Sequence, residues 1–148
     1  MTSSTGSTGS TAFSWNPETA EAYHQPGIEA LFWRPAPCLL ITRVRGHATL
    51  AGLRFYTERA VHEMRHGRLT VFHDWYELTG YDPEARDELR RWGKVHNDDF
   101  IGVHYLVRSK VIAMLISVAA LTLGRDLIAT TERDAFLARL HGVLGPQR

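Results

Sequence analysis

Cysteine is nearly absent from this chain of 148 residues, and Cys38 alone excludes an intramolecular disulfide or a cluster of thiolate metal ligands. Because Cys38 opens the apolar run Cys38–Ile41, we expect it to be a small core residue in a strand. An excess of one charge is also missing, since 17 lysine and arginine residues face 16 aspartate and glutamate residues. This balance gives no electrostatic reason to expect binding to nucleic acid or to an acidic membrane.

Long apolar runs are missing as well. The longest, Val111–Leu123, contains Ser117 and Thr122 and is shorter than the roughly 20 residues of a membrane-spanning helix. Residues 1–17 contain neither lysine nor arginine and no apolar core, so no secretory signal is expected. We therefore expect a cytoplasmic protein without an integral membrane segment.

The composition changes after the first residues. Met1–Ala12 are almost entirely serine, threonine and glycine, which predicts a flexible tail. Phe13, Trp15 and the segment Pro17–Tyr23 follow, and they are compatible either with a short helix packed on the body or with a mobile segment. We assign residues 1–26 to this tail and docking segment, and residues 27–145 to one domain of ordinary size.

Periodicity and turn residues divide the domain into alternating strands and helices. Strands are predicted at 28–34, 38–45, 69–75, 100–107 and 126–129. Helices are predicted over 50–64, from Asp82-Pro83 through Trp92, over 110–123 behind a Ser109 cap, and from a capping box at Thr131–Asp134 to Leu144.

The order β-β-α-β-α-β-α-β-α predicts an α/β fold with a mixed, mostly parallel sheet of about five strands and four helices. The helix over 110–123 is apolar nearly all round, so we expect it to be deeply buried or to cover an interface. Such a helix is compatible with a homodimer but does not require one.

This order resembles that of STAS domains, in particular their SpoIIAA-like (STAS/SEC14-type) branch. The resemblance covers about residues 27–144 and depends on three segments: Phe72–Trp75, Gly80–Arg86 and Leu106–Lys110. It implies the STAS fold and a role in regulation by protein binding, as in bacterial anti-sigma factor antagonists.

In those antagonists, a serine at the start of the helix after the third strand is phosphorylated to switch partner binding. The matching stretch here, Asp82–Ala85, has no serine or threonine, and the nearest hydroxyl, Thr79, precedes the helix. Asp82 or Glu84 would supply a permanent negative charge at this position. We therefore do not expect a phosphorylated antagonist.

The segment His62–His66 fits the pattern H-E-x-x-H, in which two histidines one helical turn apart hold Zn²⁺ and the glutamate serves as general base. Met64 lies on the apolar stripe of this helix, which turns His62 and His66 towards solvent. Gly67 ends the helix immediately afterwards. His73 or Glu77 could supply a third ligand, but we predict two surface histidines and no metal site.

Two groups of residues at the carboxyl ends of strands are candidates for binding. Arg108, Ser109 and Lys110 combine cations, a hydroxyl and a helix start, which suits an anion. The alternative is that Ser109 only caps the helix and both cations point to water. Aromatic and acidic residues near the third strand suit a partner surface or the mouth of a ligand pocket. These residues are Asp74, Trp75, Tyr76, Tyr81, Asp82 and Glu84.

No nucleophile elbow, Walker loop or dinucleotide-binding glycine motif occurs in the sequence, so we predict a non-catalytic protein without a cofactor. The first hypothesis is a regulatory module that binds a protein partner through the two groups above. The second is a carrier or sensor of a small amphipathic or anionic, lipid-like ligand. The third is a metal-dependent hydrolase that uses His62, Glu63 and His66.

Overall fold

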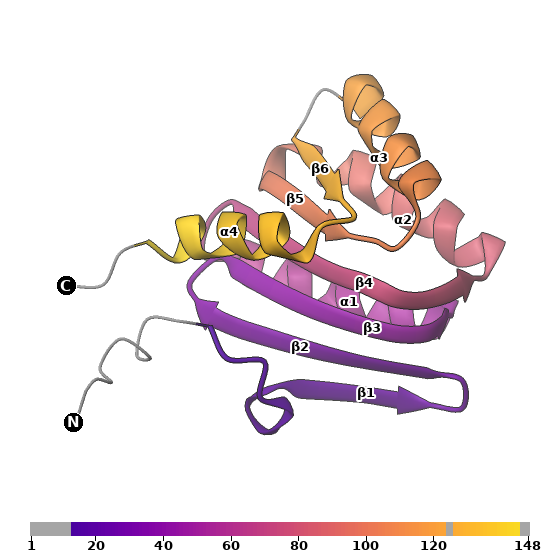
Figure 1. The fold of residues 1–148 in the computed structure, drawn as a ribbon, viewed down its shortest axis with the longest axis horizontal. Coiled ribbons are helices and arrows are strands. Elements are labelled where there is room, and N and C mark those ends of the chain that lie inside the picture. Colours follow the sequence, from indigo (N-terminus) through magenta and orange to yellow (C-terminus); the bar gives the residue numbers. More distant parts are fainter. Residues whose placement is uncertain (1–12, 124–125, 146–148) are drawn as a thin grey trace.

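A computed structural model describes residues 13–123 and 126–145, and its centre is a mixed sheet of six strands in the order β1-β2-β3-β4-β5-β6 (Figure 1). The first three strands are antiparallel neighbours, and β3 to β6 run parallel to one another. The α/β class predicted from the sequence is confirmed, with one more strand than expected. The strands are β1 (Glu21–Gln25), β2 (Ile28–Ala36), β3 (Leu39–Ala48), β4 (Leu69–Tyr81), β5 (Phe100–Leu106) and β6 (Leu127–Thr130).

Four α-helices connect or follow the parallel strands: α1 (Leu50–Met64), α2 (Pro83–Val95), α3 (Lys110–Leu123) and α4 (Arg133–Leu144). Two short 3-10 helices, η2 (Pro17–Thr19) and η3 (Asn97–Asp99), precede β1 and β5. Three starts agree with the sequence: α1 begins at Leu50, Asp82 precedes Pro83 at the start of α2, and the Ser109 hydroxyl accepts from the Ile112 amide at the start of α3. The cap of α1 is Thr49, which was not predicted from the sequence.

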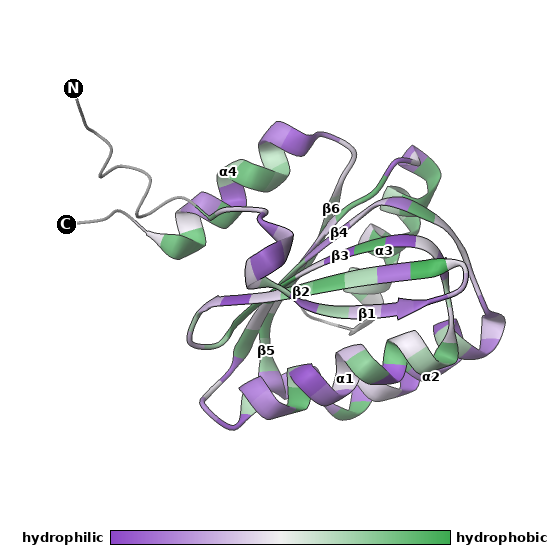
Figure 2. Ribbon diagram, turned by 90° about the horizontal axis from the view of Figure 1, so that it is seen from below, coloured by the Kyte–Doolittle hydropathy of each residue, from purple (hydrophilic) through white to green (hydrophobic). Residues whose placement is uncertain are grey.

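The helices lie on both faces of the sheet (Figure 2). On one face, Tyr56 and Ala60 of α1 join a buried cluster with Val71 and Val103, and α2 and α3 pack against its edge. On the other face, Phe136 and Leu140 of α4 pack against Phe72 and Leu106, beside Phe13 and Trp15. The two faces are unequal, since among the described residues α4 is the only α-helix on the second face, where Phe13 and Trp15 also pack.

The strand β1 was missed from the sequence. Glu21–Gln25 is polar, yet it pairs with β2 through a Pro26-Gly27 turn, so the sheet begins before the domain start predicted at Gly27. Arg59 of α1 holds the strand in place with a bidentate ion pair: its Nε and Nη2 donate to the Glu21 carboxylate at 3.1 and 2.6 Å. This hydrogen bonding holds the pKa of the Glu21 carboxyl below its ordinary value. The segment around Pro17 forms one 3-10 turn instead of the helix considered, and Met1–Ala12 lie outside the described residues.

Two local predictions were wrong. Cys38 is not a strand residue: it is half-buried in the turn between β2 and β3, with a positive φ of 60°. The predicted capping box at Thr131 does not form, because α4 begins at Arg133 and its N-cap, Glu132, makes no side-chain cap bond. The Thr130 hydroxyl instead accepts from the Glu132 amide. In both places the turn or loop extends one residue further than predicted, although β3 then continues to Ala48, beyond its predicted end.

Of the two expectations for α3, deep burial is wrong, and the covering of an interface stays a prediction. Ile116, Ala119 and Ala120 face the core, but the opposite side of the helix is exposed. Exposed fractions along that side are 64% for Val111, 64% for Met114, 59% for Leu115, 55% for Val118 and 85% for Leu121. These residues are called the α3 apolar face below. In the described part of the chain, no helix has the length and apolar character needed to cross a bilayer.

A close backbone approach joins the first two hairpins. Gly46 of β3 has a φ of 88°, and a Cβ added to it would overlap the carbonyl oxygen of Gly27. That oxygen also accepts a hydrogen bond of 2.9 Å from the His47 amide. Only glycine fits this position, because neither the backbone oxygen nor the left-handed conformation accommodates a side chain.

Replacing Gly46 with alanine should therefore destabilise the protein by about 2 kcal/mol or more. The matched variant is Gly142→Ala in α4, where an added Cβ meets nothing within 4 Å. It should stabilise by up to about 1 kcal/mol, since alanine favours the helix. Urea unfolding monitored by circular dichroism measures both free energies. Equal effects of the two substitutions would contradict the close approach.

Candidate functional site

The site is centred on a buried carboxylate in the middle of β4. Asp74 is 2% exposed and lies directly opposite Arg43 of the parallel strand β3. Its Oδ2 accepts from Arg43 Nε at 3.2 Å and from Arg133 Nη1, at the start of α4, at 3.0 Å. Its Oδ1 accepts from the Tyr76 amide at 3.1 Å. The carboxylate thus holds β3, β4 and α4 together with charge-assisted hydrogen bonds.

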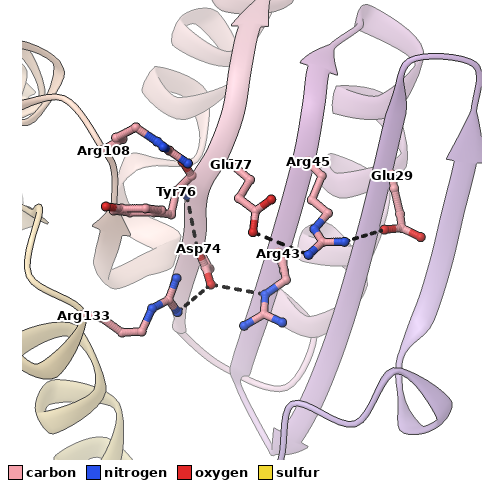
Figure 3. Close-up of polar contacts among 8 residues, drawn as sticks. All are labelled: Glu29, Arg43, Arg45, Asp74, Tyr76, Glu77, Arg108 and Arg133. Atoms are coloured by element: carbon pink, nitrogen blue, oxygen red, sulfur yellow. Dashed lines mark hydrogen bonds and ion pairs between the residues drawn. The ribbon is translucent and has the colours of Figure 1, made fainter.

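The half-buried Tyr76 ring adds a third arginine to this group (Figure 3). The Arg108 guanidinium lies 4.6 Å from the ring centroid, and the Arg133 guanidinium lies 5.6 Å from it. Arg108 Nε also donates to the Tyr76 carbonyl at 3.3 Å. Arg43 lies over a different ring, Trp15, at 4.3 Å. We call Arg43, Arg108 and Arg133 the arginine cluster.

A second row of charges follows on the same sheet face. Arg45 lies opposite both Glu29 of β2 and Glu77 of β4, with ion-pair distances of 3.8 and 3.4 Å (Figure 3). All three side chains are exposed, so each pair stabilises the fold little. Because Glu77 is paired with Arg45, it does not pair with an arginine of the arginine cluster and does not neutralise its charge.

Trp75 points to the opposite face, because side chains alternate along a strand. Its ring is 4.8 Å from His73 and 4.9 Å from Tyr105 of β5. His73 is 3% exposed and its Nδ1 is 2.8 Å from the Thr42 hydroxyl. Burial lowers the pKa of the His73 imidazole from 6.5 to about 3, so it is neutral at physiological pH.

The remaining candidates on β4 and α2 lie apart from Asp74. Tyr81 is 44% exposed at the end of β4, which continues about 20 Å along the strand beyond Asp74. Asp82 bonds His47 Nε2 through Oδ1 at 2.7 Å, and Glu84 is exposed in the first turn of α2. The structure therefore does not bring Tyr81, Asp82 and Glu84 together with the arginine cluster.

The three consecutive residues Arg108, Ser109 and Lys110 do not form one anion site. The Ser109 hydroxyl caps α3 and Lys110 is exposed at the first position of that helix, whereas Arg108 turns to Tyr76. Only Arg108 of the three joins the group around Asp74.

The H-E-x-x-H residues separate in space. His62 and His66 are exposed, as predicted, with ring centroids 6.1 Å apart. Glu63 is 8% exposed and turns towards Arg34, with 3.9 Å between Oε2 and Nη1. Among the described residues, no three histidine, cysteine, aspartate or glutamate side chains are grouped as metal ligands would be. His73 and Glu77, considered as third ligands, belong to the arrangements above.

Sequence reasoning missed two residues of the site, Arg43 and Arg133. Arg43 is a cation directly after the four buried residues 39–42 of β3, and Arg133 stands at a helix start, where a cation is unfavourable. Both of these unusual positions for an arginine could have been recognised in the sequence. Their convergence on Asp74, however, depends on the parallel pairing of β3 with β4 and on the position of α4.

The order of the strands and helices gives the class of the fold: it is a SpoIIAA-like α/β fold, as the sequence predicted. A solved structure from Shewanella loihica, an uncharacterised protein of the DUF3478 family described as having a SpoIIAA-like fold, is similar with a TM-score of 0.60. The match covers 77% of this chain and 94% of that one at 18% identity, which is a likeness of fold. No family model matches the sequence, and no curated protein gives a significant match.

The buried imidazoles predict how stability changes with pH. His73 binds a proton in the unfolded chain below its ordinary pKa of 6.5, but in the folded protein only near pH 3. The pKa of His104 is lowered in the same direction, to about 4, by burial and then by the charge of Arg139. The free energy of unfolding should therefore be intact above pH 6.5 and fall by up to about 3 kcal/mol for His73 on acidification to pH 4.

His73→Gln should keep a hydrogen bond to Thr42 while removing this titration. The slope of the unfolding free energy against pH between 6.5 and 4 should decrease by about one proton in urea titrations. The double variant with His104→Phe should flatten the slope further. A wild-type slope in both variants would show that neither imidazole is held neutral by the fold.

Proposed function

We propose that this chain is a non-catalytic interaction module that binds an α-helix of a protein partner along the α3 apolar face. Met114, Leu115 and Leu121 lie on one side of α3 and are each more than half exposed to solvent. This exposure is the observation that carries the proposal. Contiguous apolar surface of this kind marks interaction sites in folded proteins.

The spacing of the α3 apolar face favours a helical occupant. Its residues follow one another at intervals of three, one, three and three positions, from Val111 to Leu121. This is the a-d-e-a-d pattern by which one helix packs along another. A groove-binding helix recognises such a row through anchors at the same intervals.

The other side of α3 favours a protein over a lipid surface. Helices that lie in a lipid interface carry lysine or arginine along a polar side. Between Val111 and Leu121, α3 has no charged residue, and its second side packs on the sheet through Ile116 and Ala120. A narrow apolar row without flanking cations suits an apolar row on a partner helix.

Non-catalytic action is supported by the positions of the acidic and imidazole groups. Glu63 turns away from the exposed His62 and His66 towards Arg34, so these three do not converge as a hydrolytic centre requires. Asp74 is 2% exposed, and two guanidinium groups and a backbone amide occupy three of its roughly four acceptor positions, which suits a structural carboxylate better than an acid–base catalyst.

The test replaces Met114 and Leu115 together with glutamine, which keeps helix propensity and removes two apolar anchors. A photo-crosslinker at Leu121 first identifies the partner in cell extract, and the complex is then reconstituted from purified proteins. Affinity should fall about 100-fold or more in the double variant, since the loss of two apolar side chains at about 1.5 kcal/mol each amounts to about 3 kcal/mol.

The matched control is Val61→Gln with Val95→Gln, two exposed valines on α1 and α2 with fractions of 37% and 78%. This control should bind within about two-fold of wild type. Equal loss in both double variants, or crosslinks only to a second copy of this chain or to lipid, would reject the proposal.

A second candidate function is the binding of a small amphipathic ligand. It is favoured by the half-buried rings of Tyr105, at the carboxyl end of β5, and of Trp75, which contacts it from the middle of β4. The carboxyl end of a parallel strand is a location where α/β sheets bind ligands. Native mass spectrometry of gently purified protein should then reveal an added mass that disappears on denaturation and in Trp75→Ala. A spectrum with the bare polypeptide mass alone would rule this function out.

A further inference from the structure

Positive charge exceeds negative charge at the arginine cluster. Arg43 and Arg133 share one carboxylate, and they contact the same oxygen of it, Asp74 Oδ2. Arg108 contacts only a carbonyl oxygen and a ring, and no carboxylate lies within 4.0 Å of it among the described residues. Three cations thus face one anion, and the local surplus is two positive charges.

The nearby acidic side chains do not remove this surplus. Glu77, next to Tyr76 in sequence, is paired with Arg45. Glu132 and Asp134 flank Arg133, but within the described chain neither forms an ion pair with the cluster. The surplus is therefore local, although the whole chain has a net charge of only +1.

Hydrogen-bond donors are also left over. A guanidinium has five N–H donors in a planar fork. In the contacts above, each arginine of the cluster uses one nitrogen: Nε of Arg43, Nη1 of Arg133 and Nε of Arg108. The remaining N–H groups are accessible, since the Arg43 and Arg133 side chains are 27% and 42% exposed and Arg108 is exposed.

The cluster is held in place before any ligand arrives. Asp74 fixes Arg43 and Arg133, while the Tyr76 ring lies between the side chains of Arg108 and Arg133 and contacts both guanidinium groups (Figure 3). Trp15 supports Arg43 in the same way. Side chains that are already ordered lose less entropy on binding, which raises the affinity for a small ligand.

From this geometry we propose that the arginine cluster binds a phosphate dianion, either inorganic phosphate or the phosphate group of a monoester. A phosphate monoester carries about two negative charges at neutral pH, which matches the surplus. Its oxygens accept bidentate hydrogen bonds from guanidinium groups, whereas a carboxylate would neutralise only half of the charge.

The test titrates the whole chain, labelled with ¹⁵N, with inorganic phosphate and separately with O-phospho-L-serine at pH 7.5. We expect saturable shifts of the Tyr76, Arg108 and Arg133 amides with a Kd of about 1 mM or tighter. Tighter binding of phosphoserine identifies a phosphorylated molecule as the source, and equal or weaker binding identifies free phosphate. Either result supports the site.

Arg108→Ala should weaken phosphate binding about ten-fold or more, because a charge-assisted contact is lost. Its own contacts are a carbonyl and a ring, so the variant keeps the Asp74 ion pairs and should fold. Arg108→Lys should restore part of the affinity, since lysine keeps the charge but not the fork. The matched control is Arg91→Ala on α2, whose side chain is 68% exposed and paired with Glu88.

The control should bind within about two-fold of wild type, although it loses the same net charge. The proposal is overturned if no saturable shift appears by about 20 mM phosphate, or if Arg91→Ala weakens binding as much as Arg108→Ala. Because the partner helix and this phosphate would bind different surfaces, either proposal can fail while the other holds.

Discussion

Burial of the two central strands on both faces is the constraint on which the rest of the structure depends. Leu40 and Ile41 of β3, and Val71 and Phe72 of β4, point alternately to the two faces and are all 0% exposed. A parallel pair of this kind is stable only when helices cover both sides of the sheet. In the part of the chain that the structure describes, α1, α2 and α3 lie on one side and α4 is the one α-helix on the other, and this asymmetry determines where polar groups lie.

The boundary of α4 explains the position of Asp74. Under the helix, the second face is apolar through Phe72, Leu106 and Phe136; beyond it, the face carries the charged row of Arg45. Asp74 lies where one region becomes the other, so its buried carboxylate needs partners from both. Arg43 comes from the sheet and Arg133 from the helix, and one carboxylate is left between two cations. The excess of charge is thus a consequence of joining α4 to the sheet.

Most of the architecture follows from local sequence patterns, and the errors have physical causes. The core strands and the starts of α1, α2 and α3 could be predicted because periodicity and caps act over a few residues. The polar strand β1 could not, since its stability comes from pairing with β2 and from the distant Arg59. Of the candidate site, Asp74, Tyr76 and Arg108 were predicted together. Arg43 and Arg133 were not, because only tertiary structure brings them to Asp74.

The exposed side of α3 is the clearest departure from what composition alone implies. An apolar helix is expected to be buried, but the core on this side is already closed by the inner residues Ile116, Ala119 and Ala120. Stability therefore places little constraint on the outer row, and Met114 or Leu115 can change there without opening a cavity. Large apolar residues that the fold does not need, repeated at helix-packing intervals, are better explained by an occupant than by folding. For the same reason, substitutions on this row separate binding from stability.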